Sequence, residues 1–315
     1  MKPARFPRKR SNELKVLIVN SEGPARIESL DQLAAQFNPG DVLVVNRSAT
    51  LPASFQARRS SGEAFELRLA SFQGPNLESP TDWAAVTFGA GSWRDATEER
   101  GLPPGVSGGD LLHLGGDLTA RVLRVDPQSP RLIQIRFEGA DFLREVYRQG
   151  QMIQYSYLRG PLKVWDAQTD FGGPPISVEA PSAGFPIRVK WLTDLRQRGI
   201  EIVDIVHSAG LSSTGDLKLD TCLPLAEFSW VPLHTARVLN RARQEGRRII
   251  ALGTTAVRAI EAAFDGQGVQ SGQRLATVKI SSLSPPRVVQ HVITGLHEPG
   301  TSHFSLESGL ATVAQ

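Results

Sequence analysis

The chain has 315 residues, of which 40% are hydrophobic and 21% charged, and its formal net charge at pH 7 is only +3. This composition predicts a globular protein of one large or two ordinary domains. Because the net charge is low, any affinity for nucleic acid must come from local basic patches. The single cysteine, Cys222, excludes an internal disulfide and a thiolate metal cluster, and no apolar run approaches the ~18 residues of a membrane span.

The N-terminal region begins with a basic segment, residues 1–11, that lacks the apolar core of a signal peptide. Together with the single cysteine, which fits a reducing compartment, this predicts a cytoplasmic protein outside any membrane. Two valine-rich runs follow at residues 14–20 and 41–46, separated by a helical pattern over 30–37 and a turn signal at 38–41. The two runs predict two strands of a buried sheet.

The pattern of apolar and polar residues changes at Leu51. Short apolar runs are now separated by Gly, Pro, Asp and Ser, and they cover residues 65–69, 83–88, 118–125 and 132–137. Short strands at such regular spacing predict a small antiparallel barrel or sandwich over about residues 51–140. A helix is expected directly after it, at residues 141–148.

Beyond residue 175 the sequence returns to alternating strand and helix patterns. The expected elements are a helix at 189–198, a strand at 200–206, a basic helix at 232–244, a strand at 248–252 followed at once by a helix, and strands at 274–280 and 287–293. This alternation predicts an α/β fold, and it resumes a pattern begun before residue 51. We therefore predict an α/β domain, residues 1–50 and 151–315, with an inserted β-barrel domain, residues 51–150.

The stretch Gly253-Thr254-Thr255 joins the strand at 248–252 to its helix. Glycine lets the backbone turn sharply and approach a ligand, and a threonine can cap the free N–H groups of a helix. A helix that begins in this way attracts anions, because its unsatisfied N–H groups and its dipole point outward. The alternative is an ordinary strand-to-helix turn in which the threonines only cap.

Polar residues follow several of the predicted strands. Asn46, His207, the 253–255 turn and His297 each come where a strand ends. Ligands of open α/β sheets bind outside the carboxyl ends of the strands, so a mainly parallel sheet would place all four on one rim. The alternative for each histidine is a hydrogen-bonded structural residue.

Other common sites are poorly supported. The six-residue spacing of His291, His297 and His303 does not suit a metal, and the sequence lacks a Gly-x-Ser-x-Gly elbow, a Walker-type loop and a Gly-x-Gly-x-x-Gly turn after a strand. The side chains best suited to bind the phosphate backbone of a nucleic acid are three basic pairs: Arg58 and Arg59, Arg241 and Arg243, and Arg247 and Arg248. Solvated surface charge is the alternative for each pair.

Four stretches carry a resemblance to a known family. They are Asn38-Pro39-Gly40-Asp41 through Asn46 with Leu51-Pro52-Ala53, Ala180-Pro181-Ser182-Ala183-Gly184, residues 247–261, and residues 291–299. In order and content these segments resemble S-adenosylmethionine:tRNA ribosyltransferase-isomerase, the queuosine-pathway family that forms epoxyqueuosine in a tRNA anticodon. The similarity covers nearly the whole chain.

The resemblance implies an α/β domain with an inserted β-barrel and a reaction without metal or redox group. The ribosyl part of S-adenosylmethionine, as co-substrate, passes to 7-aminomethyl-7-deazaguanine in tRNA, with loss of adenine and methionine. On this basis S-adenosylmethionine is expected at Asn46, Pro181, Ser182, Ala183, Gly184, Gly253, Thr254, Thr255 and Arg258. His207 and His297 are the candidate proton-handling residues. The six arginines of the basic pairs are expected to bind tRNA near the cleft between the domains, and a monomer is favoured.

The sequence also departs from the family pattern. Phe185-Pro186-Ile187-Arg188 stands where the family has Leu-His-Phe-Thr, and residues 220–227 replace a histidine-rich stretch of which at most Glu227 is kept. Gly295 replaces an asparagine, and the sequence stops at Gln315 before the family's Tyr-Arg-Phe-Phe ending. Two alternatives therefore stay open: a non-catalytic relative that binds S-adenosylmethionine, a nucleotide or RNA, and an enzyme with the same chemistry on another acceptor.

Overall fold

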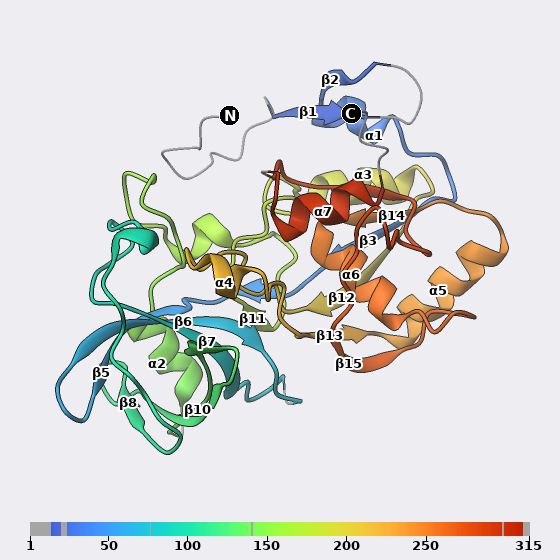
Figure 1. Ribbon diagram of the computed structural model, residues 1–315. Helices are drawn as coiled ribbons and strands as arrows, with labels where there is room; N and C mark the ends of the chain where they lie inside the picture. The colour runs from blue at the N-terminus through green and yellow to red at the C-terminus, as the bar shows by residue number, and fades with distance from the viewer. Residues whose placement is uncertain (1–13, 20–23, 76, 140, 298, 311–315) are drawn as a thin grey trace.

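The computed structural model describes residues 14–19, 24–75, 77–139, 141–297 and 299–310, which form a barrel lobe and an α/β lobe (Figure 1). The barrel lies at the left of the view and the α/β lobe at the right. The sequence prediction of an α/β fold with a small antiparallel barrel is thereby confirmed. The exact domain boundaries, at residues 51 and 150, stay a prediction.

The barrel is closed by six antiparallel strands in the order β10-β7-β6-β5-β8-β9. Their bounds are β5 Ser54–Arg59, β6 Ala64–Phe72, β7 Asp82–Phe88, β8 Leu111–His113, β9 Thr119–Asp126 and β10 Ser129–Glu138. The four predicted runs correspond to β6, β7, β9 and β10. Sequence analysis missed β5 and β8, the second of which has only three residues. A 3-10 turn, η1 (Thr97–Glu99), precedes β8, and helix α2 (Phe142–Gln149) follows the barrel as expected.

The α/β lobe is built on a six-stranded sheet in the order β15-β13-β12-β3-β14-β16. The strands are β3 Val42–Asn46, β12 Glu201–His207, β13 Glu227–Val231, β14 Ile249–Leu252, β15 Gly272–Ala276 and β16 His291–Ile293. Strands β12, β3, β14 and β16 are parallel, whereas β13 and β15 form an antiparallel edge. The carboxyl ends of the four parallel strands therefore meet at one edge of the sheet.

Strand β3 shows why the predicted strands of this sheet are continuous apolar runs. Val42 and Val44 belong to the core beneath helices α5 and α6, whereas Leu43 and Val45 belong to the core beneath α1 and α3. Side chains of a strand alternate between its faces, so a sheet covered on both faces needs apolar residues at every position. The helices are α1 Leu30–Ala34, α3 Val189–Gln197, α5 Leu233–Gln244 and α6 Thr254–Ala263, with short α4 Leu217–Asp220 and α7 Ser302–Ser308.

The prediction that residues 14–20 form a strand of the buried sheet is wrong. Strand β1 (Lys15–Ile18) pairs only with β2 (Arg26–Ser29), in a separate antiparallel pair. Leu17 is 50% exposed and Ile27 is 70% exposed, so this pair has only one partly covered face. Its partner strand is near in sequence, and a local hairpin forms without insertion into the central sheet. Position 20 lies outside the described residues.

Two further features position the site. Strand β13 was not predicted, and it carries Glu227 into the lobe as its first residue. A short parallel pair, β4 (Ala49–Thr50) with β11 (Pro175–Ser177), joins the start of the barrel segment to the chain that returns from it. The return segment includes the 3-10 turn η2 (Val164–Ala167). As a result, residues on both sides of the barrel insertion lie beside the sheet edge.

Candidate active site

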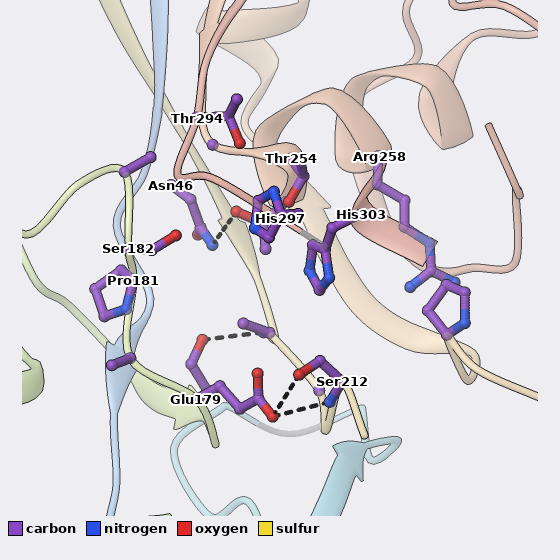
Figure 2. A pocket seen from close by; sticks show the side chains of 18 of the residues that line it. Asn46, Glu179, Pro181, Ser182, Ser212, Thr254, Arg258, Thr294, His297 and His303 are labelled. Atoms are coloured by element: carbon purple, nitrogen blue, oxygen red, sulfur yellow. Dashed lines mark hydrogen bonds between the residues drawn. The ribbon is translucent and has the colours of Figure 1, made fainter. Parts of the chain in front are cut away.

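A cavity of about 680 Å³ lies at the carboxyl ends of β3, β12 and β14. All eleven residues predicted to bind S-adenosylmethionine or to handle protons line it, and several are seen in Figure 2: Asn46, Pro181, Ser182, Ala183, Gly184, His207, Gly253, Thr254, Thr255, Arg258 and His297. The expectation that the strand ends share one rim is confirmed. The individual roles of these residues stay predictions.

Helix α6 begins at the cavity. Gly253 is its N-cap residue, with φ of +93°, a backbone conformation that favours glycine. The prediction that a threonine caps this helix is wrong, because Thr254 and Thr255 are already its first two residues and the N-cap makes no side-chain hydrogen bond. The described residues supply no acceptor for the backbone N–H groups of Thr254 and Thr255. The helix therefore presents free donors at the cavity.

Asn46 forms hydrogen bonds that connect three elements at the rim of the cavity. Its Oδ1 accepts hydrogen bonds from the backbone N–H groups of His207 (3.0 Å) and Ser48 (3.1 Å). Its Nδ2 donates to the carbonyl of His207 (2.9 Å) and to Oγ1 of Thr255 (3.3 Å). Both ends of the amide are thus engaged with protein, so Asn46 fixes the ends of β3, β12 and α6 relative to one another.

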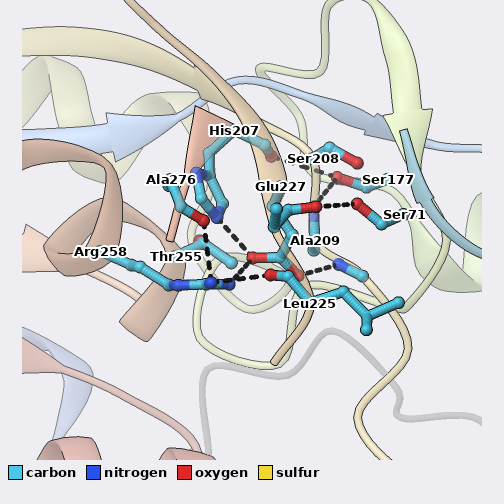
Figure 3. A network of polar contacts seen from close by, with 12 residues as sticks. Ser71, Ser177, His207, Ser208, Ala209, Leu225, Glu227, Thr255, Arg258 and Ala276 are labelled. Atoms are coloured by element: carbon cyan, nitrogen blue, oxygen red, sulfur yellow. Dashed lines mark hydrogen bonds and ion pairs between the residues drawn. The ribbon is translucent and has the colours of Figure 1, made fainter. Parts of the chain in front are cut away.

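A buried polar network lies behind this rim (Figure 3). His207 Nε2 is 2.9 Å from Oε2 of Glu227, and the same carboxylate pairs with Arg258 and accepts the N–H of Gly210 at 2.7 Å. Arg258 also donates to the carbonyls of Leu225 (2.7 Å), Ala276 (2.9 Å) and Val278 (3.1 Å). Its guanidinium is therefore held by protein groups, and Arg258 acts on the cavity chiefly through Glu227.

The network fixes the protonation of Glu227. Burial raises the pKa of this carboxyl, but the hydrogen bond and charge of His207 and the charge of Arg258 outweigh it, so its pKa lies below the ordinary 4.5. An ionised Glu227 accepts the Nε2–H of His207, and this hydrogen bond orients the ring. The ring is fully buried, and Nδ1 has no hydrogen-bond partner among the described residues.

A second carboxylate, Glu179, lines the cavity and was missed by sequence analysis. Its Oε1 accepts hydrogen bonds from the hydroxyl of Tyr155 (3.0 Å) and from the backbone N–H and Oγ of Ser212 (both 2.9 Å). Burial raises the pKa of Glu179 above 4.5, and the charge of Glu227 adds to this effect against the lowering by the hydrogen bonds. Its position directly before the 180–184 motif was the available signal.

His297 is held by the C-terminal helix. Its Nδ1 is 2.7 Å from Oε1 of Glu307, which also accepts the hydroxyl of Thr294 at 2.8 Å. The ring stacks on that of His303, with centroids 4.6 Å apart. Burial and the neighbouring His297 lower the pKa of His303. Neither Glu307 nor His303 was predicted to belong to the site, because α7 follows the last recognisable strand by several residues.

The segment 180–184 closes another side of the cavity. A Cβ atom on Gly184 would lie 2.9 Å from Cγ2 of Thr169, and a Cβ on Gly295 would lie 2.7 Å from Oγ of Ser182. Gly295 stands where the family pattern has asparagine. Here the close approach of Ser182 favours glycine, so the departure follows from how these two loops pack.

Comparison with known proteins bears on the chemistry of this cavity. Residues 2–315 match the family described as queuosine biosynthesis protein. The chain belongs to this family. Two relatives are each named S-adenosylmethionine:tRNA ribosyltransferase-isomerase. That of Thermus thermophilus is 32% identical over 93% of this chain and 82% of its own length, and that of Citrifermentans bemidjiense is 28% identical over 98% and 87%.

A solved structure is also similar. The crystal structure of S-adenosylmethionine tRNA ribosyltransferase from Thermotoga maritima is 19% identical, with a TM-score of 0.46 over 98% of this chain and 86% of that one. The family resemblance that the sequence motifs suggested is thus confirmed by the family match.

The six arginines predicted to bind tRNA do not line the cavity of this queuosine-family protein. Arg247 and Arg241 pair with Glu201, and Arg248 pairs with Asp41. Asp41 and Glu201 stand at the amino ends of β3 and β12, about 16 Å along the strands from the cavity at 3.3 Å per residue. The carboxylate partners hold these arginines at the opposite edge of the sheet.

The other three arginines predicted to bind tRNA also lie far from the cavity. The guanidinium of Arg243 lies over the ring of Phe264, 4.4 Å from its centroid, and Arg59 pairs with Glu63. Arg58 precedes Arg59 at the far end of β5, and Figure 1 shows β5 and α5 on opposite sides of the molecule. The prediction that both groups lie near the cleft between the lobes is wrong. Whether they bind tRNA stays a prediction.

Two further features concern metal binding and membrane spans in the described residues. In that part of the chain, no three His, Cys, Asp or Glu side chains are grouped so that they could hold a metal ion. The longest described helix, α5, has 12 residues, and none of the described helices has the length and apolar character needed to cross a membrane.

Proposed function

We propose that this protein transfers the ribosyl part of S-adenosylmethionine to 7-aminomethyl-7-deazaguanine in tRNA, forming epoxyqueuosine and releasing adenine and methionine. The observation that carries the proposal is the convergence of the family-like motifs, which are far apart in the sequence, on one cavity. Relatives that carry this activity in their names match almost the whole chain.

The amino end of α6 is the proposed anchor for S-adenosylmethionine. The free N–H groups of Thr254 and Thr255 and the helix dipole suit its carboxylate or its ribose hydroxyls. The 180–184 loop faces this end, since a Cβ on Gly253 would lie only 3.8 Å from Cβ of Ala183. Pro181 to Gly184 would then shape the other side of the co-substrate.

Two histidines are the proposed proton-handling groups. The reaction must remove a proton from S-adenosylmethionine, and a histidine can do so near neutral pH. His207 and His297 each have one ring nitrogen fixed by a carboxylate, Glu227 or Glu307. This arrangement orients each ring, and Nδ1 of the buried His207 has no hydrogen-bond partner among the described residues.

Co-substrate binding is tested by calorimetry with S-adenosylmethionine. Thr254→Val keeps the backbone N–H and removes the hydroxyl at the same helix end, so the loss of one hydroxyl hydrogen bond to the co-substrate is expected to weaken binding about 5- to 10-fold. Thr193→Val, on the exposed face of α3, is the matched control and should bind as the wild type does. Absence of binding heat with the wild type would count against the proposed site.

The reaction is tested by incubating the purified chain with S-adenosylmethionine and tRNA that carries the 7-aminomethyl-7-deazaguanine base. Released adenine and a nucleoside of increased mass are expected, and His297→Ala should abolish both. Adenine without a modified nucleoside would indicate another acceptor. Neither product, with co-substrate binding intact, would favour the non-catalytic relative that binds a nucleotide or RNA.

A further inference from the structure

The two carboxylates that line the cavity differ in their surroundings. Glu227 is paired with Arg258 and His207, which fix it in the ionised form. Glu179 has no cationic partner among the described residues, and its pKa is raised by burial and by the charge of Glu227. When two carboxyl groups of one site are shifted in opposite directions, the group with the raised pKa is the one suited to exchange a proton.

The hydrogen bonds of Glu179 fix its orientation. Tyr155 and Ser212 donate three hydrogen bonds to Oε1, whereas Oε2 has no hydrogen-bond partner in the described part of the chain. Figure 2 shows Glu179 and Ser212 on the opposite wall of the cavity from Thr254 and His297. Oε2 is therefore an acceptor held in place and left for a ligand.

The surroundings of Glu179 favour a cation. Tyr155 and Tyr157 also line the cavity, and their rings stack with centroids 5.8 Å apart. Aromatic faces and a carboxylate both attract positive charge. A sulfonium group has no N–H to donate, whereas a primary ammonium group can donate a hydrogen bond to Oε2. The wall opposite α6 thus suits an ammonium group, while the helix end suits anionic or hydroxyl groups.

We infer that Glu179, with Tyr155 and Tyr157, forms the subsite for the primary ammonium group of the acceptor base, and that Glu179 takes one proton from it. This inference rests on the proposed function, which supplies a 7-aminomethyl group as the acceptor. One N–H bond of the ammonium breaks and one O–H bond forms on Oε2. The electron pair of the broken bond stays on nitrogen, which becomes a neutral amine able to attack the ribosyl carbon.

Charged groups near the subsite come from several elements. Glu227 of β13 faces Glu179 across the cavity and disfavours a second negative charge, while Arg68 of β6 acts on the Tyr155 hydroxyl. Arg258 is engaged by Glu227, and His207 and His297 face the same space. A bound ammonium group supplies the positive charge that Glu179 otherwise lacks, so the ionised form of Glu179 is stabilised when the acceptor is bound.

The subsite is tested first by binding alone. The probes are two anticodon stem-loop RNAs that differ only in carrying 7-aminomethyl- or 7-methyl-7-deazaguanine, at one salt concentration. The wild type should bind the amine RNA about 10-fold more tightly, as for one charged hydrogen bond. Glu179→Gln keeps Oε1 as an acceptor and should show no preference, whereas Glu99→Gln, at an exposed side chain without a described hydrogen bond, should keep it. A wild type without preference, or a Glu179→Gln variant that keeps it, would overturn the inference.

Proton transfer is tested by single-turnover rates against pH. The wild-type rate should fall on the acid side as Glu179 and the proton-accepting histidine are protonated, and Glu179→Gln should be slower by about 10²-fold or more and lose the part of this limb that Glu179 contributes. Glu179→Asp should retain the limb, and S-adenosylmethionine binding should be unchanged in both variants. A normal rate in Glu179→Gln, or equal losses of rate and of S-adenosylmethionine binding, would overturn the proposed role.

The two sets of measurements separate this inference from the proposed function. If the wild type prefers the amine RNA through Glu179 but forms no product, the ammonium subsite stands and the proposed reaction fails. If the wild type forms product and Glu179→Gln does so equally well, the reaction stands and the subsite fails.

Discussion

Two buried glutamate–arginine clusters, one in each lobe, have similar chemistry but different surroundings. In the barrel, Glu66 accepts from Nε of Arg68 and from Oγ of Ser54, both at 2.6 Å, and it also pairs with Arg100. In the α/β lobe, Glu227 pairs with Arg258 and His207. The glutamate in each cluster has a pKa below its ordinary value, because its partners outweigh the effect of burial.

The difference lies in access. Glu227, His207 and Arg258 line the cavity, whereas none of the three charged barrel residues does. A shifted pKa therefore does not identify a functional site by itself, since a structural ion-pair cluster shifts a carboxyl group in the same direction. The barrel cluster fastens the loop that carries Arg100 to the barrel, and the α/β cluster holds the ring of His207 in the wall of the cavity.

The largest effect is expected on stability, from Glu66→Ala. This change leaves Arg68 and Arg100 buried without a counter-charge, which typically costs about 3–5 kcal/mol of unfolding free energy. Glu63→Ala, at a 53% exposed side chain on the same hairpin, should cost at most about 1 kcal/mol. Urea unfolding measures both. A loss below about 1 kcal/mol for Glu66→Ala would remove the contrast between the two clusters.

The next effect is expected on catalysis, from His207→Gln. Product formation should slow by about 10²-fold, or about 2.7 kcal/mol of transition-state free energy, because the imidazole proposed to handle protons is lost while a side chain able to reach Glu227 remains. His113→Gln, at an exposed end of β8, should leave the rate unchanged. Single-turnover assays decide the outcome. If His207→Gln forms product at the wild-type rate, the α/β cluster has only a structural role, as the barrel cluster does.

The pH dependence of stability should sharpen the comparison. The folded pKa values of Glu66 and Glu227 are lowered, so their contributions are present above 4.5 and are lost as the pH falls through the folded values. The folded pKa of Glu179 is raised, so its ionisation opposes folding as the pH rises above 4.5. Glu179→Gln should therefore be more stable than the wild type at pH 7, with a smaller gain at pH 4. Equal gains at both pH values would contradict this.

The smallest effect is expected for surface arginines. If Arg58 contacts tRNA, Arg58→Ala should reduce the log-log slope of affinity against salt by about one. Arg241→Ala should leave the slope unchanged, because this 55% exposed side chain is already paired with Glu201, and its stability should change by at most about 0.5 kcal/mol. If the wild type and both variants show the same salt dependence of tRNA affinity, neither arginine group belongs to the tRNA-binding surface.

The sequence by itself determined the fold class and most elements of the central sheet. Runs such as residues 42–45 and 249–252 are apolar at every position because a sheet covered on both faces requires it. The sequence also determined which residues lie at the rim of the cavity. Parallel strands end at one edge of the sheet, and polar side chains such as Asn46 and His207 stand at these strand ends. The local pattern of residues 14–20 was equally strand-like, but a pattern cannot state which strand will be its partner.

Only the tertiary structure decided how the site works. Glu227 begins an unpredicted antiparallel strand, and Glu179 and Glu307 arrive from segments without a strong periodic pattern. The strength of each carboxyl group as an acid depends on burial and on charges that are distant in sequence, as Glu227 is from Glu179 and Arg258 is from Glu227. Likewise, the local pattern around Arg241, Arg247 and Arg248 does not indicate that Asp41 and Glu201 hold these arginines at the far edge of the sheet. These properties depend on through-space distance, which the order of residues along the chain does not specify.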